Sequence, residues 1–150
     1  MIYLQTNESL SLPIDTEILE QAAQETLRHQ SAPAEAELTL VLTDDEQLRQ
    51  LNHEFLGVDA PTDVLSFPSS ELDPDTGSIY LGDVVISLPH ALAQADAGGH
   101  PIADELQLLV VHGILHLVGY DHLEQVDKEK MQVAQDNVLH QLGVRLVSTL

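Results

Sequence analysis

Three histidines near the end of the sequence have the spacing of a metal site. His112 and His116 are four residues apart in an apolar run, so on a helix both imidazoles leave the same face, about one turn apart. Gly119 can take the left-handed conformation that ends a helix and turns the chain, which brings His122 toward the other two. Three nitrogen ligands suit zinc and leave a coordination position open for water. The pattern therefore predicts one zinc ion per chain, bound by these three histidines.

Zinc in such a site supports two kinds of hydrolytic chemistry. The pKa of a zinc-bound water falls from 15.7 toward about 7, and a bound phosphate oxygen is polarised for attack by a neighbouring 2′-hydroxyl. Both routes stay open from the sequence. Gly113 stands where H-E-x-x-H proteases carry a glutamate base, which disfavours an ordinary zinc protease. Asp121 either orients a ligand imidazole or satisfies backbone N–H groups of the turn, and we assign no protein base.

Three blocks of the sequence resemble one known family. Residues 111–122 read V-H-G-I-L-H-L-V-G-Y-D-H and are similar to the H-x3-H-x5-H signature of the YbeY family of bacterial metal-dependent endoribonucleases, the rRNA maturation factors. Residues 51–68 resemble that family's N-x-x-[FY]-x-G-x-x-x-P-T-[DN]-V-L-S-F segment, and residues 81–87 its G-D-[IV]-x-I-S strand. The blocks stand in the family's order, and the chain has the family's length.

The resemblance implies a function as well as a fold. It implies a zinc-dependent, single-strand-specific endoribonuclease acting in 16S rRNA 3′-end maturation and ribosome quality control, with rRNA and the small ribosomal subunit as partners. It also implies a single domain of this kind over residues 1–150. Many family members have an arginine, the usual candidate for a phosphate contact, where this chain has Leu56. We predict Arg49, two turns earlier on the same helix stripe, as the substitute that contacts RNA.

The charge balance is unusual for a protein that acts on RNA. The sequence of 150 residues has 25 acidic and five basic residues and a formal net charge of −20, which repels polyanions at long range. Such an excess is typical of a solvated acidic surface, and it also fits docking of a basic ribosomal protein. The few basic residues therefore matter individually; they are Arg28, Arg49, Lys128, Lys130 and Arg145.

Two absences narrow the classes of protein that fit. Without cysteine, neither disulfides nor thiolate ligands are available, so a transition-metal site must use His, Asp or Glu. The amino terminus lacks a basic region followed by an apolar stretch, and no run of about 18 apolar residues occurs. From these patterns we expect a soluble cytoplasmic protein with no membrane partner.

The predicted elements explain how the histidines are positioned. Residues 102–118 are apolar on nearly every side, which predicts a zincin-like metal-binding helix buried between a sheet and other helices. Earlier residues alternate strands and helices, and the order β-α-β-α-β-β-α-α-α predicts an α+β domain with a mixed sheet of about four strands. Expected strands are 2–6, 37–42, 62–67 and 79–87; expected helices are 15–30, 43–56, 88–98, 102–118 and 123–142.

Local signals fix several of these boundaries. Thr43 and Glu46 have the spacing of a capping box, and Ser87 can cap the next helix. Gly82 inside a strand indicates a bulge or a close backbone approach. The core face of the second helix is predicted from its helical period to contain Leu48, Leu51 and Phe55.

Two functions from different classes fit these observations. One is the endoribonuclease, and the open coordination position favours it. The other is a non-catalytic ribosome-assembly factor, in which zinc only stabilises the turn at Gly119 and the acidic surface binds a basic ribosomal protein. Leu56 and the net charge of −20 favour this second function. The fourth metal ligand separates them, because water supports catalysis and a protein side chain supports a structural role.

Overall fold

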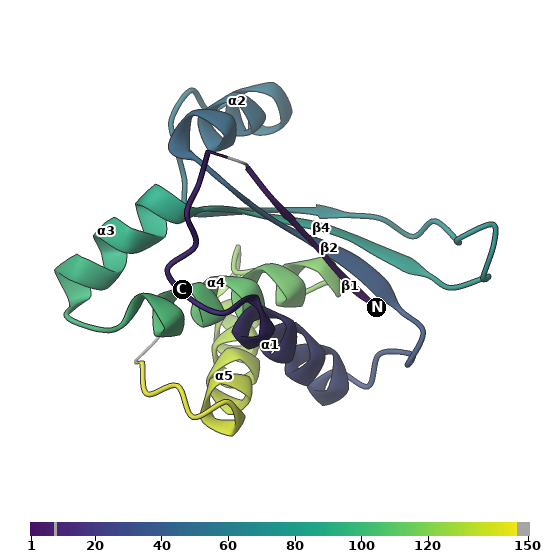
Figure 1. Cartoon of the computed structure of the whole chain (residues 1–150). Coiled ribbons are helices and arrows are strands. Elements are labelled where there is room, and N and C mark those ends of the chain that lie inside the picture. The colour runs from purple at the N-terminus through teal and green to yellow at the C-terminus, as the bar shows by residue number, and fades with distance from the viewer. Residues whose placement is uncertain (8, 147–150) are drawn as a thin grey trace.

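Four strands form one mixed sheet in the order β1-β2-β4-β3 (Figure 1). This computed structural model describes residues 1–7 and 9–146. β1 pairs with β2 and β2 with β4 in parallel, whereas β3 pairs with β4 as an antiparallel hairpin. The predicted mixed sheet and hairpin are thereby confirmed. The strands are β1 (Ile2–Thr6), β2 (Glu37–Thr43), β3 (Val64–Pro68) and β4 (Tyr80–Ser87).

Helices cover both faces of this sheet within the described residues. α1, α4 and α5 lie on one side and α2 on the other, while α3 extends beyond the end of the sheet (Figure 1). The order of the elements is the predicted one, and none of the described helices is long and apolar enough to cross a membrane. The helices are α1 (Thr16–His29), α2 (Asp45–Leu56), α3 (Leu88–Gly98), α4 (Ile102–Leu117) and α5 (Gln125–Gln141).

The helix α4 is packed on two sides, which fixes its position. Leu106, Val110 and Ile114 are fully buried against the sheet and α1. Val111 and Leu115 belong to a second apolar cluster, which they form with residues of α5. Burial of apolar surface on both sides stabilises the helix by roughly 25 cal/mol per Å² removed from water. The histidines of α4 therefore stand on a rigid element.

Gly113 allows α4 to approach the sheet closely. A Cβ atom at this position would lie 2.4 Å from Cγ1 of Val84 and 3.3 Å from the Ser66 hydroxyl oxygen. The same Ser66 hydroxyl donates a hydrogen bond to the Gly113 carbonyl oxygen at 2.8 Å. This position faces β3 and β4, so it has no room for the glutamate of an H-E-x-x-H protease.

We predict that Gly113→Ala destabilises the protein by about 1–3 kcal/mol, because overpacking forces Val84 or the backbone to move. Urea unfolding measures the change in the free energy of unfolding. The contact itself is tested by Gly113→Ala in a Val84→Ala background, where the two clashing methyl groups are absent. In that background, Gly113→Ala should lower the free energy of unfolding by clearly less than it does when Val84 is present. An equal cost in both backgrounds would show that the Val84 contact is not the cause.

The start of α2 differs from the sequence prediction. Its N-cap is Asp44, whose side chain accepts a hydrogen bond from the backbone N–H of Gln47 at 2.9 Å. Thr43, the predicted cap, is still in β2 and pairs with Ser87 of β4. A residue held in the sheet cannot also begin the helix, so the helix begins one residue later than the capping-box pattern predicts.

The core face of α2 is also different from the prediction. Leu48 is fully buried as expected, but Phe55 is 59% exposed and contacts the Phe67 ring edge-on at 5.1 Å between centroids. Asn52 is buried in its place and donates a hydrogen bond to the Ala60 carbonyl oxygen at 2.9 Å. The chain after α2 folds back over Asn52. The helical periodicity of α2 alone cannot predict this contact.

Candidate metal centre

His112, His116 and His122 lie together, with their ligand nitrogens all within 4.8 Å of one another. Within residues 1–7 and 9–146 they are the one group of three His, Cys, Asp or Glu side chains close enough to hold a metal ion. The turn after α4 brings in His122: Gly119 has a φ of +107°, and its N–H donates to the His116 carbonyl oxygen at 3.1 Å. The expected turn is therefore present.

Hydrogen bonds fix the orientation of the two imidazoles on α4. Nδ1 of His112 lies 2.9 Å from the side-chain oxygen of Gln135, and Nδ1 of His116 lies 2.9 Å from the Tyr120 carbonyl oxygen. A carbonyl oxygen can only accept, so both Nδ1 atoms carry the proton and both Nε2 atoms present a lone pair. Ligand histidines in metal sites are oriented in this way by an outer hydrogen bond.

The two lone pairs face each other, and this arrangement fits a cation. The Nε2 atoms of His112 and His116 are 3.2 Å apart. Two nitrogens bound to one tetrahedral zinc ion at about 2.0–2.1 Å would be roughly 3.3 Å apart. Without a cation, two neutral acceptors at this distance repel each other, because neither has a proton to donate. The donor set and its spacing therefore fit a zinc-like ion.

Burial keeps both imidazoles of α4 neutral. Desolvation lowers the pKa of His112, and desolvation together with the neighbouring His112 lowers the pKa of His116 to about 4. A histidine must be neutral to bind a metal, so at neutral pH no proton has to be removed from these nitrogens first. His122 is exposed, so the cluster is open to solvent on its side.

We predict that Gly119→Ala weakens zinc binding through backbone strain. No atom lies within 4 Å of the added Cβ, so the cost arises from the positive φ, about 1–3 kcal/mol. Gly77→Ala is the matched control: its φ is +74°, its Cβ also meets nothing, and it lies in the loop between β3 and β4. Isothermal titration with zinc should show a loss of affinity for Gly119→Ala alone. Unchanged affinity would mean that the turn does not position His122.

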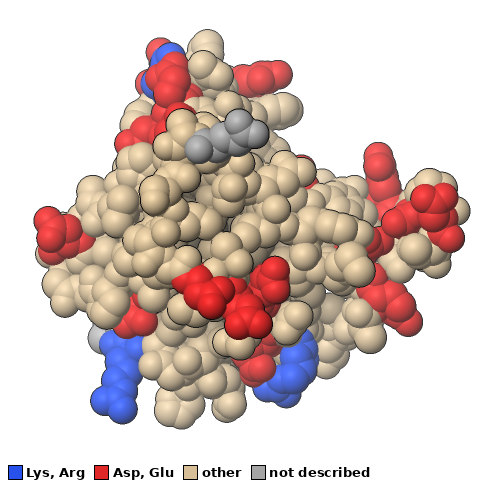
Figure 2. Space-filling view, in the orientation of Figure 1, with Lys and Arg blue, Asp and Glu red and all other residues tan. Residues whose placement is uncertain are grey.

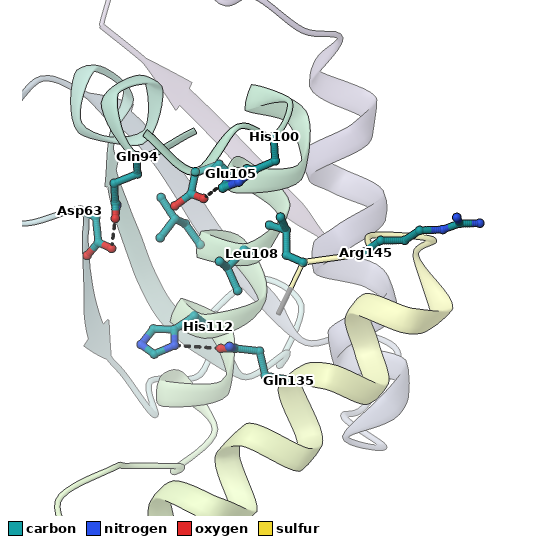
Figure 3. A pocket seen from close by; sticks show the side chains of 11 residues that line it. Asp63, Gln94, His100, Glu105, Leu108, His112, Gln135 and Arg145 are labelled. Carbon is teal, nitrogen blue, oxygen red and sulfur yellow. Dashed lines mark hydrogen bonds and ion pairs between the residues drawn. The ribbon is translucent and has the colours of Figure 1, made fainter. Parts of the chain in front are cut away.

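A cleft of about 600 Å³ lies beside His112 (Figure 3). Two polar pairs line it together with that histidine. The Gln94 amide donates to the Asp63 carboxylate at 3.3 Å, and Nε2 of His100 lies 2.6 Å from a carboxylate oxygen of Glu105. Through His112, the histidine cluster is therefore at the edge of a cavity that is large enough for part of a polymeric substrate.

Sequence reasoning missed most of these polar residues. Neither His100 nor Gln135 belongs to a recognisable motif, although Gln135 is 1% exposed in the structure. A signal was present in both helices. Glu105 interrupts an otherwise apolar face of α4, and Gln135 lies between the buried Met131 and Val138 of α5. A polar residue at a core position needs a partner, and here that partner lies in or beside the cleft.

Other residues singled out from the sequence lie outside the cluster. Asp121 accepts a hydrogen bond from the Leu123 N–H at 3.3 Å, so it does satisfy the backbone of the turn. Arg49 is bound by the carboxylates of Glu46 and Asp59, and it does not line the cleft. Its contact with RNA stays a prediction. Leu56 is 64% exposed at the end of α2.

The surface charge agrees with the composition. Figure 2 shows carboxylates dispersed over one face of the molecule, with few basic side chains among them. Of the five basic residues, Arg28 and Arg49 are paired with carboxylates on their own helices. An approaching polyanion therefore meets little uncompensated positive charge on these residues.

The matched family supports what the site geometry indicates. The model of the family described as endoribonuclease YbeY matches residues 4–143 of the chain. The chain belongs to the YbeY endoribonuclease family. The endoribonuclease YbeY of Desulfitobacterium hafniense is 44% identical over 135 residues, which cover 86% of each chain. That of Moorella thermoacetica is 40% identical over 149 residues, covering 93% of this chain and 96% of the relative.

A solved structure shares the fold of this chain. The solution structure of a Thermotoga maritima protein has a TM-score of 0.62 and 25% identity, and the match covers 95% of this chain and 89% of that one. The family resemblance, the α+β fold and the assignment as an endoribonuclease are thus confirmed. The histidine cluster is where this chain can hold a metal ion.

Proposed function

We propose that this YbeY-family chain is a zinc-dependent endoribonuclease in the cytoplasm that cuts single-stranded rRNA, in 16S 3′-end maturation and ribosome quality control. His112, His116 and His122 are its metal ligands. The observation that carries the proposal is the pair of Nε2 lone pairs 3.2 Å apart at the edge of the cleft. That arrangement fits a bound cation, and three protein ligands leave a position open for chemistry.

The residues around this centre have separate roles. Zinc, when bound, supplies a Lewis acid that polarises a phosphate oxygen and lowers the pKa of water. Gln135 and Tyr120 hold the two α4 imidazoles in the tautomer with Nε2 free. Asp121 stabilises the turn that carries His122. The cleft lined by Leu108 and Leu109 orients the RNA strand and excludes water from its apolar wall.

Partners of the enzyme are expected to supply the positive charge and the RNA contacts that its own surface lacks. A chain with a net charge of −20 gains little from phosphate contacts, so we place its activity on the small ribosomal subunit, where rRNA is already held. A basic ribosomal protein is the complementary surface for its carboxylates.

An assembly factor without catalysis is the second candidate, and one observation favours it. Arg49, the basic residue nearest in sequence to the family's arginine position at Leu56, is already bound by Glu46 and Asp59. A chain that neither attracts nor contacts phosphate could still bind the subunit through a basic protein and be stabilised by zinc.

Mapping the 3′ end of 16S rRNA separates the two candidates. Precursor small subunits are incubated with zinc-loaded protein, with His116→Ala, and with His90→Ala as the matched control, since His90 is a histidine on α3 outside the cluster. We expect cleavage by the wild type and by the His90 variant and none by the His116 variant. Intact precursor in every reaction, with stoichiometric zinc and subunit binding preserved, would establish the assembly factor.

A further inference from the structure

Away from the metal-binding histidines, the charge of the cleft does not favour phosphate. Asp63 and Glu105 bring two carboxylates to its walls, and the one Lys or Arg among the described residues that line it is Arg145. Figure 3 shows the Arg145 side chain extending away from the cavity. Ionised carboxylates accept hydrogen bonds and never donate them. The cleft is therefore suited to groups of a nucleotide that donate hydrogen bonds, namely sugar hydroxyls and the amino groups of bases.

Glu105 is the carboxylate whose position is fixed most firmly. It is 4% exposed, and one of its oxygens lies 2.6 Å from Nε2 of His100. The His100 ring rests against Gly98, where an added Cβ would lie 2.6 Å from the ring. Its other oxygen has no hydrogen-bond partner among the described residues, and Figure 3 shows it directed away from His100. Glu105 therefore has one carboxylate oxygen whose position is fixed and which is free to accept a hydrogen bond.

The distance of Glu105 from the three histidines places its free oxygen beside the scissile bond and not at it. Glu105 and His112 are seven residues apart on α4, which is two turns or about 10.5 Å along the helix. Stacked nucleotides rise about 3.4 Å along a strand, so Glu105 lies within about three nucleotides of the cluster. Leu108 and Leu109 line the cleft between the two and give an apolar surface for the sugar or base.

We propose that Glu105, positioned by His100, accepts a hydrogen bond from the ribose 2′-hydroxyl of a nucleotide that flanks the scissile bond. The cleft then selects RNA over DNA through the sugar and not through phosphate. Buried carboxylates bind ribose hydroxyls in other nucleotide sites, and the 2′-hydroxyl is the group by which a protein distinguishes RNA from DNA. This inference rests on the proposed function, because it takes single-stranded RNA as the substrate.

A cycle of protein and sugar changes tests the contact. Single-stranded RNA hexamers, each with one 2′-deoxynucleotide at a different position, are bound to the metal-free full chain and followed by fluorescence anisotropy, and the same hexamers are cleaved by the zinc-loaded chain. For the wild type we expect one flanking position at which loss of the hydroxyl weakens binding about tenfold, typical of a hydrogen bond to a charged group. Glu105→Leu should bind the hexamers that keep this hydroxyl about tenfold more weakly than the wild type does. It should bind the hexamer that lacks the hydroxyl as the wild type does, so the discrimination is lost.

Variants of the neighbouring residues distinguish a contact from a structural effect. His100→Leu should reduce the discrimination, whereas His100→Gln, which can still donate to Glu105, should keep most of it. Asp104→Asn removes an adjacent carboxylate of α4 that does not line the cleft, and it should leave the discrimination unchanged. If Glu105→Leu does not fold, the wild-type scan and the two His100 variants decide whether the ribose contact exists.

The results separate this inference from the proposed function. Equal binding of all hexamers by the wild type, or full discrimination retained in Glu105→Leu, would overturn the ribose contact even if RNA is cleaved normally. Discrimination that depends on Glu105, with no cleavage of any hexamer or of precursor subunits, would keep the ribose contact and refute the endoribonuclease.

Discussion

Zinc binding in a one-to-one ratio is expected to disappear when His116 is replaced by alanine. The imidazole of His116 is half-buried, oriented by the Tyr120 carbonyl oxygen and 3.2 Å from Nε2 of His112, so alanine removes a ligand nitrogen that is already in place. A ligand that binds only the folded state stabilises it by about 4 kcal/mol when present at 1,000 times its dissociation constant. For a chain of this length that is on the order of 10 °C in melting temperature.

The measurement is elemental analysis together with melting curves recorded with and without zinc. Wild-type protein and the His90→Ala control should both show the zinc-dependent rise in melting temperature. His116→Ala should show none, whatever its stability without metal. One tightly held zinc per chain in His116→Ala would refute the assignment of the ligands.

Binding of free single-stranded RNA is expected to be weak and only slightly dependent on salt. Arg49 is engaged by Glu46 and Asp59, and Leu56 offers no charge, so we expect one or two phosphate contacts. With a slope of about −0.7 per neutralised phosphate, affinity should fall only about three- to sevenfold between 50 and 200 mM salt. Precursor subunits should be cut at least about tenfold faster than a free oligonucleotide, because the subunit holds the RNA near the cleft.

The chain offers a direct control for this charge argument. Leu56→Arg restores the arginine of other family members at a position that is 64% exposed, so little packing is lost. It should make the slope of log affinity against log salt steeper by about the amount of one further phosphate contact. It should also raise the affinity for free RNA. Tight, steeply salt-dependent binding by the unaltered protein would contradict the argument, as would a Leu56→Arg variant with an unchanged slope.

Local signals in the sequence were sufficient for most of the fold. The apolar residues of α4 come from all sides of the helix, and that pattern correctly predicts a helix buried between the sheet and α5. Ser87 caps α3 through the His90 N–H, and Gly82 lies so close to β3 that a Cβ would meet the Phe67 carbonyl oxygen at 2.2 Å. Each of these outcomes depends on residues that are near in sequence or on a single strand.

The surroundings of the histidines could not be predicted in this way. Gln135 contacts His112 across 23 residues of sequence, and Gln94 contacts Asp63 across 31. These pairs depend on how α5 and α3 pack against α4 and β3, which no periodicity in one element encodes. Arg49 illustrates the same limit, because Asp59 reaches it only after the chain folds back beyond α2.

The fourth ligand of the bound zinc tests the endoribonuclease most directly. Crystals of the zinc-loaded protein, with anomalous scattering measured at the zinc edge, would locate the ion and everything bound to it. We predict zinc at the Nε2 atoms of His112 and His116 and at a ring nitrogen of His122, with a water on the side of the 600 Å³ cleft. A protein side chain in the fourth position, or zinc bound elsewhere, would contradict a catalytic centre at these histidines.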